Sequence, residues 1–67
     1  MKKISNRELE ILRFVAKGLT DKEIATVLNI ARGTVINIRK KLYKKLEVHN
    51  GAEAVNEGYQ LGLLKVE

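Results

Sequence analysis

The 67-residue chain contains no cysteine, and this absence excludes two ways of stabilising a small protein. Neither a disulfide framework nor a cysteine-based metal site can form, and we expect no metal and no cofactor. No uninterrupted apolar run follows the first lysines, so there is no secretory signal, and no apolar run is long enough to span a membrane. We therefore expect a protein of the reducing cytoplasm with no membrane partner.

Proline and aromatic residues are also scarce. The chain has no proline, no tryptophan and a single phenylalanine, whereas hydrophobic residues make up 45% of the sequence. That fraction is enough for a packed core and too high for an intrinsically disordered chain. At this length we expect one domain over residues 1–67, with a small and mostly aliphatic core.

Acidic residues are missing from the middle of the chain. The formal net charge is +5, and no acid occurs between Ile24 and Leu46. A local positive patch of this kind is the usual mark of a polyanionic partner. On composition alone, a solvated face of lysines and arginines explains the pattern equally well.

Polar capping residues mark the predicted helix starts. "SNRE" (5–8) and "TDKE" (20–23) are capping boxes, and Asn50 in "NGAE" (50–53) is a weaker cap. Each precedes a run of apolar residues with helical spacing, and no segment alternates convincingly like a strand. We predict an all-α, four-helix bundle-like domain with helices over about 6–16, 21–28, 32–46 and 51–61. The residues expected to face inward are Leu9, Leu12, Val15, Ala16, Ile24, Ala25, Val27, Leu28, Val35, Ile38, Leu42, Leu46, Ala54, Leu61 and part of Val55.

Only three residues, Asn29 to Ala31, separate the second and third predicted helices. Asn29 suits a tight turn because asparagine tolerates the left-handed conformation, and Ile30 then points back inward. Ala25 is small enough to let the two helices cross closely. This spacing is the pattern of a helix-turn-helix, and a generic helical hairpin would not need it.

The third predicted helix has an apolar side and a basic side. At 100° per residue, its apolar stripe faces the core, and the opposite side carries Gly33, Asn37, Lys40, Lys41 and Lys44. A protruding helix of this kind suits the major groove of double-stranded DNA. Asn37 can pair with adenine and Lys40 can donate to guanine, so these two are candidate base contacts.

A second group of residues is better suited to phosphate. Lysines towards the end of the third helix lie where the groove curves away, and the start of the second helix offers backbone N–H groups to an anion. The candidate phosphate contacts are Thr20, Lys22, Thr34, Lys41, Lys44 and Lys45. The alternative remains a solvated charged face.

Several stretches of the chain together match a known family pattern. "LTDKEIATVLNIARGTV", followed by "KKLEV" and "AEAV", resembles the LuxR/GerE-type DNA-binding domain at the C-terminus of NarL- and FixJ-like response regulators. The resemblance covers residues 4–64 and implies a regulator of transcription. It also implies a dimer contact on the fourth helix, which we expect to be weak and favoured on DNA. The surface for that contact is offered by Ala52, Val55, Asn56 and Tyr59.

The chain departs from this family at several positions. Ala31 replaces a usual serine cap, Ile38 a frequent histidine and Gly51 a usual arginine. Ile36 replaces a lysine or arginine, and an apolar side chain there suits the methyl group of thymine, so Ile36 joins the candidate base contacts. Family members usually carry a further N-terminal domain, so the chain is either a free-standing small regulator or a fragment of a longer one.

Some features of the sequence also fit other classes of function. "RGTV" and the basic helix also resemble region 4 of sigma factors, and the fourth helix could bind an acidic partner such as RNA polymerase. An enzyme is not expected, because His49 is the only histidine and no glycine-rich phosphate loop or paired carboxylate accompanies it. The leading prediction is sequence-specific binding of double-stranded DNA.

Overall fold

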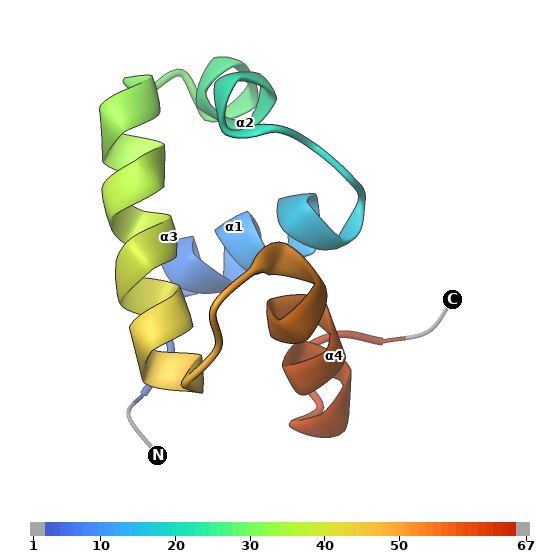
Figure 1. Cartoon of the computed structure of the whole chain (residues 1–67). Helices are drawn as coiled ribbons and strands as arrows, with labels where there is room; N and C mark the ends of the chain where they lie inside the picture. The colour runs from blue at the N-terminus through green and yellow to red at the C-terminus, as the bar shows by residue number, and fades with distance from the viewer. Residues whose placement is uncertain (1–2, 66–67) are drawn as a thin grey trace.

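Four helices make up the described part of the chain, which covers residues 3–65 (Figure 1). In this computed structural model, α1 spans Asn6–Ala16, α2 spans Asp21–Leu28, α3 spans Arg32–Leu46 and α4 spans Gly51–Gln60. No strand occurs among these residues, so the predicted all-α class is confirmed. The predicted ranges also hold, except that α4 ends one residue earlier than expected.

Three of the helices begin at the predicted polar caps. The Ser5 hydroxyl accepts a hydrogen bond from the Glu8 backbone N–H at 3.1 Å, and the Glu8 carboxylate accepts one from the Ser5 N–H at 2.8 Å. Thr20 and Glu23 repeat this reciprocal pair at the start of α2. Asn50 caps α4 through one bond from a first-turn N–H at 2.9 Å. These bonds satisfy N–H groups that have no partner within the helix.

Two helices end on a non-glycine residue in the left-handed conformation. Asn29 follows α2 with a φ of 55°, and Glu47 follows α3 with a φ of 58°. After each of them, Ile30 or Val48 donates a backbone hydrogen bond of 3.0 Å to the carbonyl five residues back. This Schellman geometry returns both apolar side chains to the core. The Asn29 turn was predicted, whereas no residue preference pointed to Glu47.

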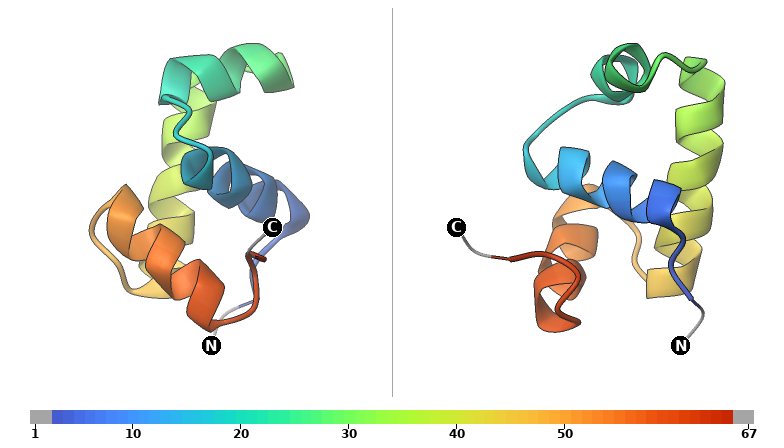
Figure 2. Two further views of the ribbon diagram at one scale, coloured as in Figure 1. Left: turned by 90° about the vertical axis from the view of Figure 1, so that its right-hand side faces the viewer. Right: turned by 180° about the vertical axis from the view of Figure 1, so that it is seen from behind.

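The longest helix, α3, runs along one side of the molecule (Figures 1 and 2). α2 lies across its N-terminal end, and α1 packs against both α3 and α4. The core therefore collects side chains from all four helices and from the segment after α4. Its fully buried large residues are Ile11, Leu12, Ile24, Val35 and Leu42.

The buried face of α1 differs from the prediction at two positions. Ile11 is fully buried although it was not expected in the core, and Ala16 is exposed although it was expected inward. Leu12 is buried as predicted, while Leu9 and Val15 are half-buried. The reason is that α1 contacts both α3 and α4, so its buried centre lies at Ile11 and Leu12, whereas Ala16 at the end of the helix stays exposed.

Two further residues predicted to face inward lie on the surface. Val27 is 58% exposed, because α2 packs through Ile24, Ala25 and Leu28, and Val27 lies roughly 110° around the helix from the middle of that stripe. Leu61 is 40% exposed, since it follows the last residue of α4 and the chain turns away there. Both predictions were wrong, and both concern residues at the margin of an apolar stripe.

Candidate nucleic-acid interface

α2 and α3 form the helix-turn-helix that the sequence predicts. Ile24 is fully buried, and Ala25 keeps only 8% of its surface exposed. Val35 is fully buried on α3, and three more apolar residues of the motif pack half-buried around this core: Leu28, Ile30 and Ile38. Because the two helices share these contacts and a tight turn, the direction in which α3 presents its outer face is fixed.

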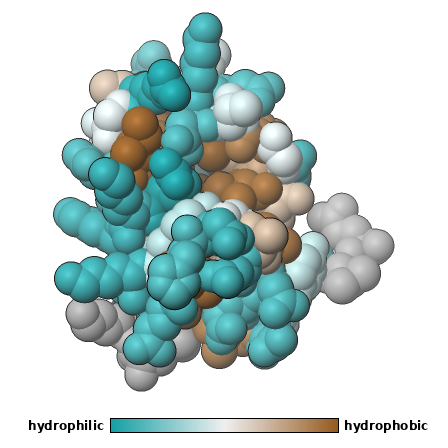
Figure 3. Space-filling view, in the orientation of Figure 1, coloured by the Kyte–Doolittle hydropathy of each residue, from teal (hydrophilic) through white to brown (hydrophobic). Residues whose placement is uncertain are grey.

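The outer face of α3 carries the polar and basic residues expected there. Val35, Leu42 and Leu46 are buried on the inner side. Figure 3 shows hydrophilic side chains covering most of the side along which α3 runs. The outer face is made of five exposed residues, Gly33, Asn37, Lys40, Lys41 and Lys44. We call these five residues the outer face of α3.

The candidate base contacts lie on the second and third turns of α3. Asn37 and Lys40 are exposed, and Ile36 beside them is half-buried. Within residues 3–65, neither the Asn37 amide nor the Lys40 ammonium group forms a side-chain hydrogen bond or ion pair. α3 begins at Arg32, and Ala31 before it provides no side-chain cap, as predicted. The polar groups near this end of α3 are therefore available to a ligand.

Cations from α2 and α3 meet beside the start of α2. A shallow hollow there is lined by Lys22 of α2 and by Arg32 and Arg39 of α3, together with Thr20 and Asp21. Thr20 and Lys22 are exposed, and so is Thr34 on α3. The Thr20 hydroxyl accepts the Glu23 N–H, and this leaves its own hydrogen free to be donated to an anion.

Arg39 has a structural partner that the sequence did not reveal. Its guanidinium group donates to the Asp21 carboxylate at 2.9 Å, and the guanidinium carbon lies 5.5 Å from the centre of the Tyr43 ring. Both charged side chains of the pair are about three-quarters buried. Arg39 thus ties the start of α2 to the middle of α3. The two residues are far apart in the sequence, so helical spacing could not predict the contact.

Lys45, like Arg39, is bound to an acidic residue of another helix. Its ammonium group lies 2.6 Å from the Glu8 carboxylate and also donates to the Lys3 backbone carbonyl at 3.0 Å. Glu8 is only 4% exposed, so this ion pair is largely shielded from water. The structure uses Lys45 to join the end of α3 to the start of α1, in a place where the sequence predicted a phosphate contact.

The two capping glutamates have lowered pKa values. Burial raises the pKa of Glu8, but hydrogen bonds from Lys45 and Ser5 and the positive charge of Lys45 together outweigh that effect and lower it. Hydrogen bonds from the Thr20 backbone and hydroxyl lower the pKa of Glu23, which is exposed. Both carboxylates therefore stay ionised at neutral pH, and Glu8 keeps Lys45 in place.

The residues suggested for a dimer contact lie along one part of α4. Ala52, Asn56 and Tyr59 are exposed, with 42% of the Tyr59 surface accessible, and Val55 is half-buried. Ala54 is fully buried on the inner side, as predicted. The face formed by Ala52, Val55, Asn56 and Tyr59 is small and contains one aromatic ring.

Comparison with known proteins identifies the family to which the chain belongs. Residues 2–57 match the GerE model, described as bacterial regulatory proteins of the luxR family. The chain belongs to the luxR family of bacterial regulatory proteins. This LuxR-family domain is a helix-turn-helix DNA-binding domain of transcriptional regulators, and the resemblance inferred from the sequence is confirmed.

Several longer proteins are similar to this LuxR-family domain. It is 41% identical over 63 residues to the uncharacterised response regulatory protein YgeK of Escherichia coli, and 42% identical over 62 residues to the transcriptional regulatory protein DesR of Bacillus subtilis. These matches cover 94% and 92% of the chain but only 43% and 31% of the relatives. The chain thus spans less than half the length of either protein.

The fold is shared with a solved structure. The response regulator ChrA of a heme-sensing two-component system matches 96% of this LuxR-family domain with a TM-score of 0.91 and 33% sequence identity, over 32% of its own length. The family is one of DNA-binding regulators rather than enzymes, in agreement with the sequence prediction. In residues 3–65, no helix has the length and apolar character needed to cross a membrane, and no cluster of potential metal ligands occurs.

Proposed function

We propose that this domain reads double-stranded DNA in the major groove through the outer face of α3. The observation that carries the proposal is the contrast between the two sides of that helix. On its inner side, Val35 and Leu42 are buried in the core. Its outer side carries polar and basic groups without partners in residues 3–65. A rigidly seated helix with an unpaired polar ridge has the geometry of a recognition helix.

Three residues are assigned to base edges. The Asn37 amide can donate to and accept from adenine at once, and the Lys40 ammonium group can donate to guanine. Ile36, half-buried beside them, offers an apolar surface to a thymine methyl group. Together they would read a short half-site, since one helix covers only a few base pairs.

Five residues are assigned to phosphates. Lys41 and Lys44 extend the outer face of α3 towards its C-terminal end, and Thr34 lies exposed near its start. Thr20 and Lys22 lie at the first turn of α2, where backbone N–H groups would also bind a phosphate. Lys45 is left out of this interface, because a phosphate contact would require breaking its ion pair with Glu8.

Two copies would bind adjacent half-sites through weak contacts between their α4 helices. The face of Ala52, Val55, Asn56 and Tyr59 is too small to hold a stable dimer in dilute solution. Two copies on one duplex gain effective concentration, so the same contact becomes sufficient there. A regulator acting in this way would work on the bacterial nucleoid in the cytoplasm, with RNA polymerase as a further candidate partner.

The base assignments are tested by selecting bound duplexes from a random pool and repeating the selection with variants. Asn37→Ala and Lys40→Ala should each weaken the preferred site by about 1–3 kcal/mol and relax the sequence preference at one position. Lys41→Ala is the matched control, and it should weaken all sequences alike. Equal loss on every sequence for all three variants would refute the base assignments.

The dimer assignment is tested by sedimentation with and without a duplex that carries two half-sites. Ala52→Arg places like charges together in a symmetric contact and should abolish cooperative binding of the second copy. Gln60→Arg is the control, because Gln60 is exposed on the same helix but about a quarter turn from the centre of the face. Cooperativity that survives Ala52→Arg would remove α4 from the contact.

A further inference from the structure

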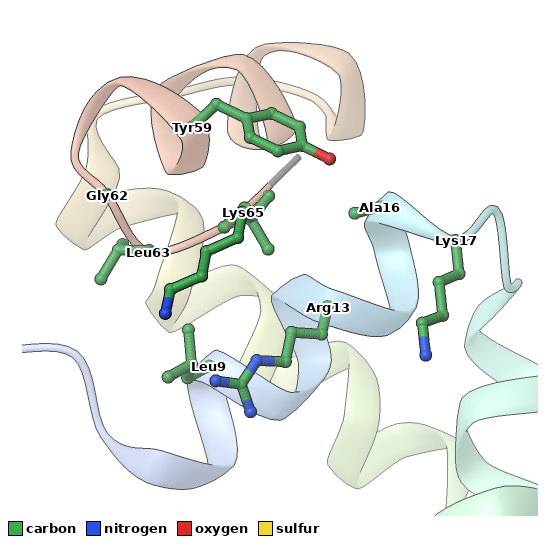
Figure 4. A pocket seen from close by; sticks show the side chains of 9 residues that line it. Leu9, Arg13, Ala16, Lys17, Tyr59, Gly62, Leu63 and Lys65 are labelled. Carbon is green, nitrogen blue, oxygen red and sulfur yellow. The ribbon is translucent and has the colours of Figure 1, made fainter. Parts of the chain in front are cut away.

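A groove lies between α1 and the end of α4, away from the proposed DNA-binding face. It encloses about 640 Å³, and none of the residues that line it comes from α2 or α3. Figure 4 shows Tyr59 along one side of the groove, the turn at Gly62 and Leu63 closing one end, and α1 along the other side. The volume falls within the usual range of ligand pockets.

The floor of the groove is apolar and partly open to water. Leu64 is buried there, Leu9 and Leu63 are half-buried, and Ala16 is exposed. Tyr59, 42% exposed, extends its ring along the same space. Apolar surface left accessible in a concave site favours the burial of an apolar side chain from a partner.

The rim of the groove is positively charged. Arg13, Lys17 and Lys65 line it, and among residues 3–65 no acidic residue does. Arg13 and Lys65 extend towards the end where Leu9 lies, while Lys17 stands at the other end beside Ala16 (Figure 4). In the part of the chain that the structure describes, none of these three cations forms an ion pair.

We propose that this groove binds a short acidic segment of another protein, with an apolar side chain placed between its carboxylates. The carboxylates would meet Arg13 and Lys65 at one end and Lys17 at the other, and the apolar side chain would cover Leu9, Leu63 and Leu64. The positive rim favours a partner with negative charge, and the apolar floor favours a partner that carries an apolar side chain. A phosphate backbone has no apolar side chain to bury, so a polypeptide satisfies both features and a nucleic acid only one.

This proposal does not depend on the reading of DNA by α3. Groove and outer face share no residue, so the domain could hold an acidic segment while it is bound to DNA. A protein held at this place would be recruited to the site that α3 selects. Failure of one proposal is therefore distinguishable from failure of the other.

The probe is a short fluorescein-labelled peptide of aspartates and glutamates around one leucine and one phenylalanine. Two control peptides separate the contributions. The first keeps the acids and replaces the leucine and phenylalanine by serine, and the second keeps the apolar residues and replaces the acids by their amides. Fluorescence anisotropy measures affinity, and amide chemical shifts of the isotope-labelled domain locate the bound peptide.

Two double variants each replace two basic residues by glutamate, so they change the net charge of the domain by the same amount. Arg13→Glu with Lys17→Glu alters the groove, and Lys40→Glu with Lys41→Glu alters the outer face of α3. Ala16→Phe is a third variant, which fills the groove without changing charge and adds the ring at an exposed position. Circular dichroism shows which variants remain folded, and duplex binding is measured for each of them.

The groove pair and Ala16→Phe should each lower peptide affinity by about tenfold, and both should leave duplex binding intact. The α3 pair should do the reverse. Both control peptides should bind more weakly than the probe, and the shifted amides should cluster around Tyr59, Leu63 and Lys65. The proposal would be overturned if the two double variants lost the same amount of peptide affinity, or if the serine control peptide bound as tightly as the probe. Loss of duplex binding in the groove pair would assign the groove to nucleic acid instead.

Discussion

Lys44 and Lys45 are neighbours on α3, yet the two sides of the helix give them different surroundings. Lys44 lies exposed on the outer face, and Lys45 is bound to the buried Glu8 carboxylate at 2.6 Å. The same contrast separates Lys40, which is exposed, from Arg39, which is bound to Asp21.

This difference shows that the positive charge of α3 has two uses. The cations on its flanks fasten the helix to α1 and α2, whereas the cations on its outer face have no partner within residues 3–65. A residue count of lysines and arginines would treat them alike. Only their positions around the helix and the acids that they meet tell which ones remain for DNA.

The sharpest way to test the contrast is to truncate one residue on each side of α3. Leu42→Ala removes a fully buried side chain and should cost about 2–5 kcal/mol of unfolding free energy, a large part of the stability of a domain of this size. Lys41→Ala, one residue earlier on the outer face, should change that free energy by less than about 0.5 kcal/mol. Urea unfolding followed by circular dichroism measures both. Similar losses for the two variants would contradict the assignment of inner and outer sides.

The next effect concerns the ion pair on the flank. Glu8→Ala removes half of a capping box and leaves the Lys45 ammonium group without its carboxylate, so we expect a loss of about 1–3 kcal/mol. Glu23→Ala removes the equivalent residue of the other capping box, which is exposed and has no lysine partner within residues 3–65. Its effect should be clearly smaller. Equal losses would mean that the pair with Lys45 adds nothing to the cap.

The pH dependence of stability should report the same pair. Because the pKa of Glu8 is lower in the folded domain than in the unfolded chain, the ionised carboxylate stabilises the fold above its ordinary pKa. That contribution is lost as the pH falls below the ordinary value and through the lower folded value. Glu8→Gln should flatten this acid limb of a thermal unfolding series, and the part due to Glu23 should remain. An unchanged slope would refute the contribution of Glu8.

Much of the fold could be predicted because its signals are local. The capping residues Ser5, Thr20 and Asn50 mark helix starts, and the turn at Asn29 follows from a residue preference combined with tight spacing. These features depend on a few neighbouring residues, so the sequence displays them directly. The outer face of α3 follows as well, because rotation by 100° per residue separates it from a strong apolar stripe.

The remainder depends on contacts between distant residues. The pairing of Lys45 with Glu8 joins α3 to the start of α1, and periodicity along either helix carries no information about it. Ile11 is a core residue because α1 packs on two helices at once, and Val27 is exposed because it lies off the stripe through which α2 packs on α3. The groove between α1 and α4 is likewise a product of packing, since its cations come from both ends of the chain.

A smaller effect separates Lys44 from Lys45 on DNA. Lys44→Ala should lower affinity for every duplex alike and reduce the slope of affinity against salt by about one, as expected for one lost phosphate contact. Lys45→Ala should leave that slope unchanged and lower the unfolding free energy instead, because its partner is Glu8. Fluorescence titrations over a range of salt concentrations measure the slopes. A reduced slope for Lys45→Ala would return this residue to the interface.

The smallest expected effect concerns the start of α3, where the helix has no side-chain cap. Ala31 adopts an extended conformation with φ −67° and ψ 144°, close to that of Ser5 at φ −75° and ψ 162°, so the backbone is already arranged for a cap. The Thr34 N–H already donates to the Ala31 backbone carbonyl at 3.0 Å, and a serine hydroxyl at position 31 would offer it a second acceptor, in the way that Ser5 accepts the Glu8 N–H.

Ala31→Ser should therefore raise the unfolding free energy by about 0.5–1 kcal/mol, which corresponds to a rise of a few degrees in the melting temperature. Ala31→Val is the matched control, because valine tolerates the extended backbone but has no acceptor for the N–H. Thermal unfolding of the three proteins side by side measures the difference. A gain in both variants would attribute the effect to side-chain bulk, and no gain in either would show that the backbone bond from Thr34 to the Ala31 carbonyl already satisfies this N–H.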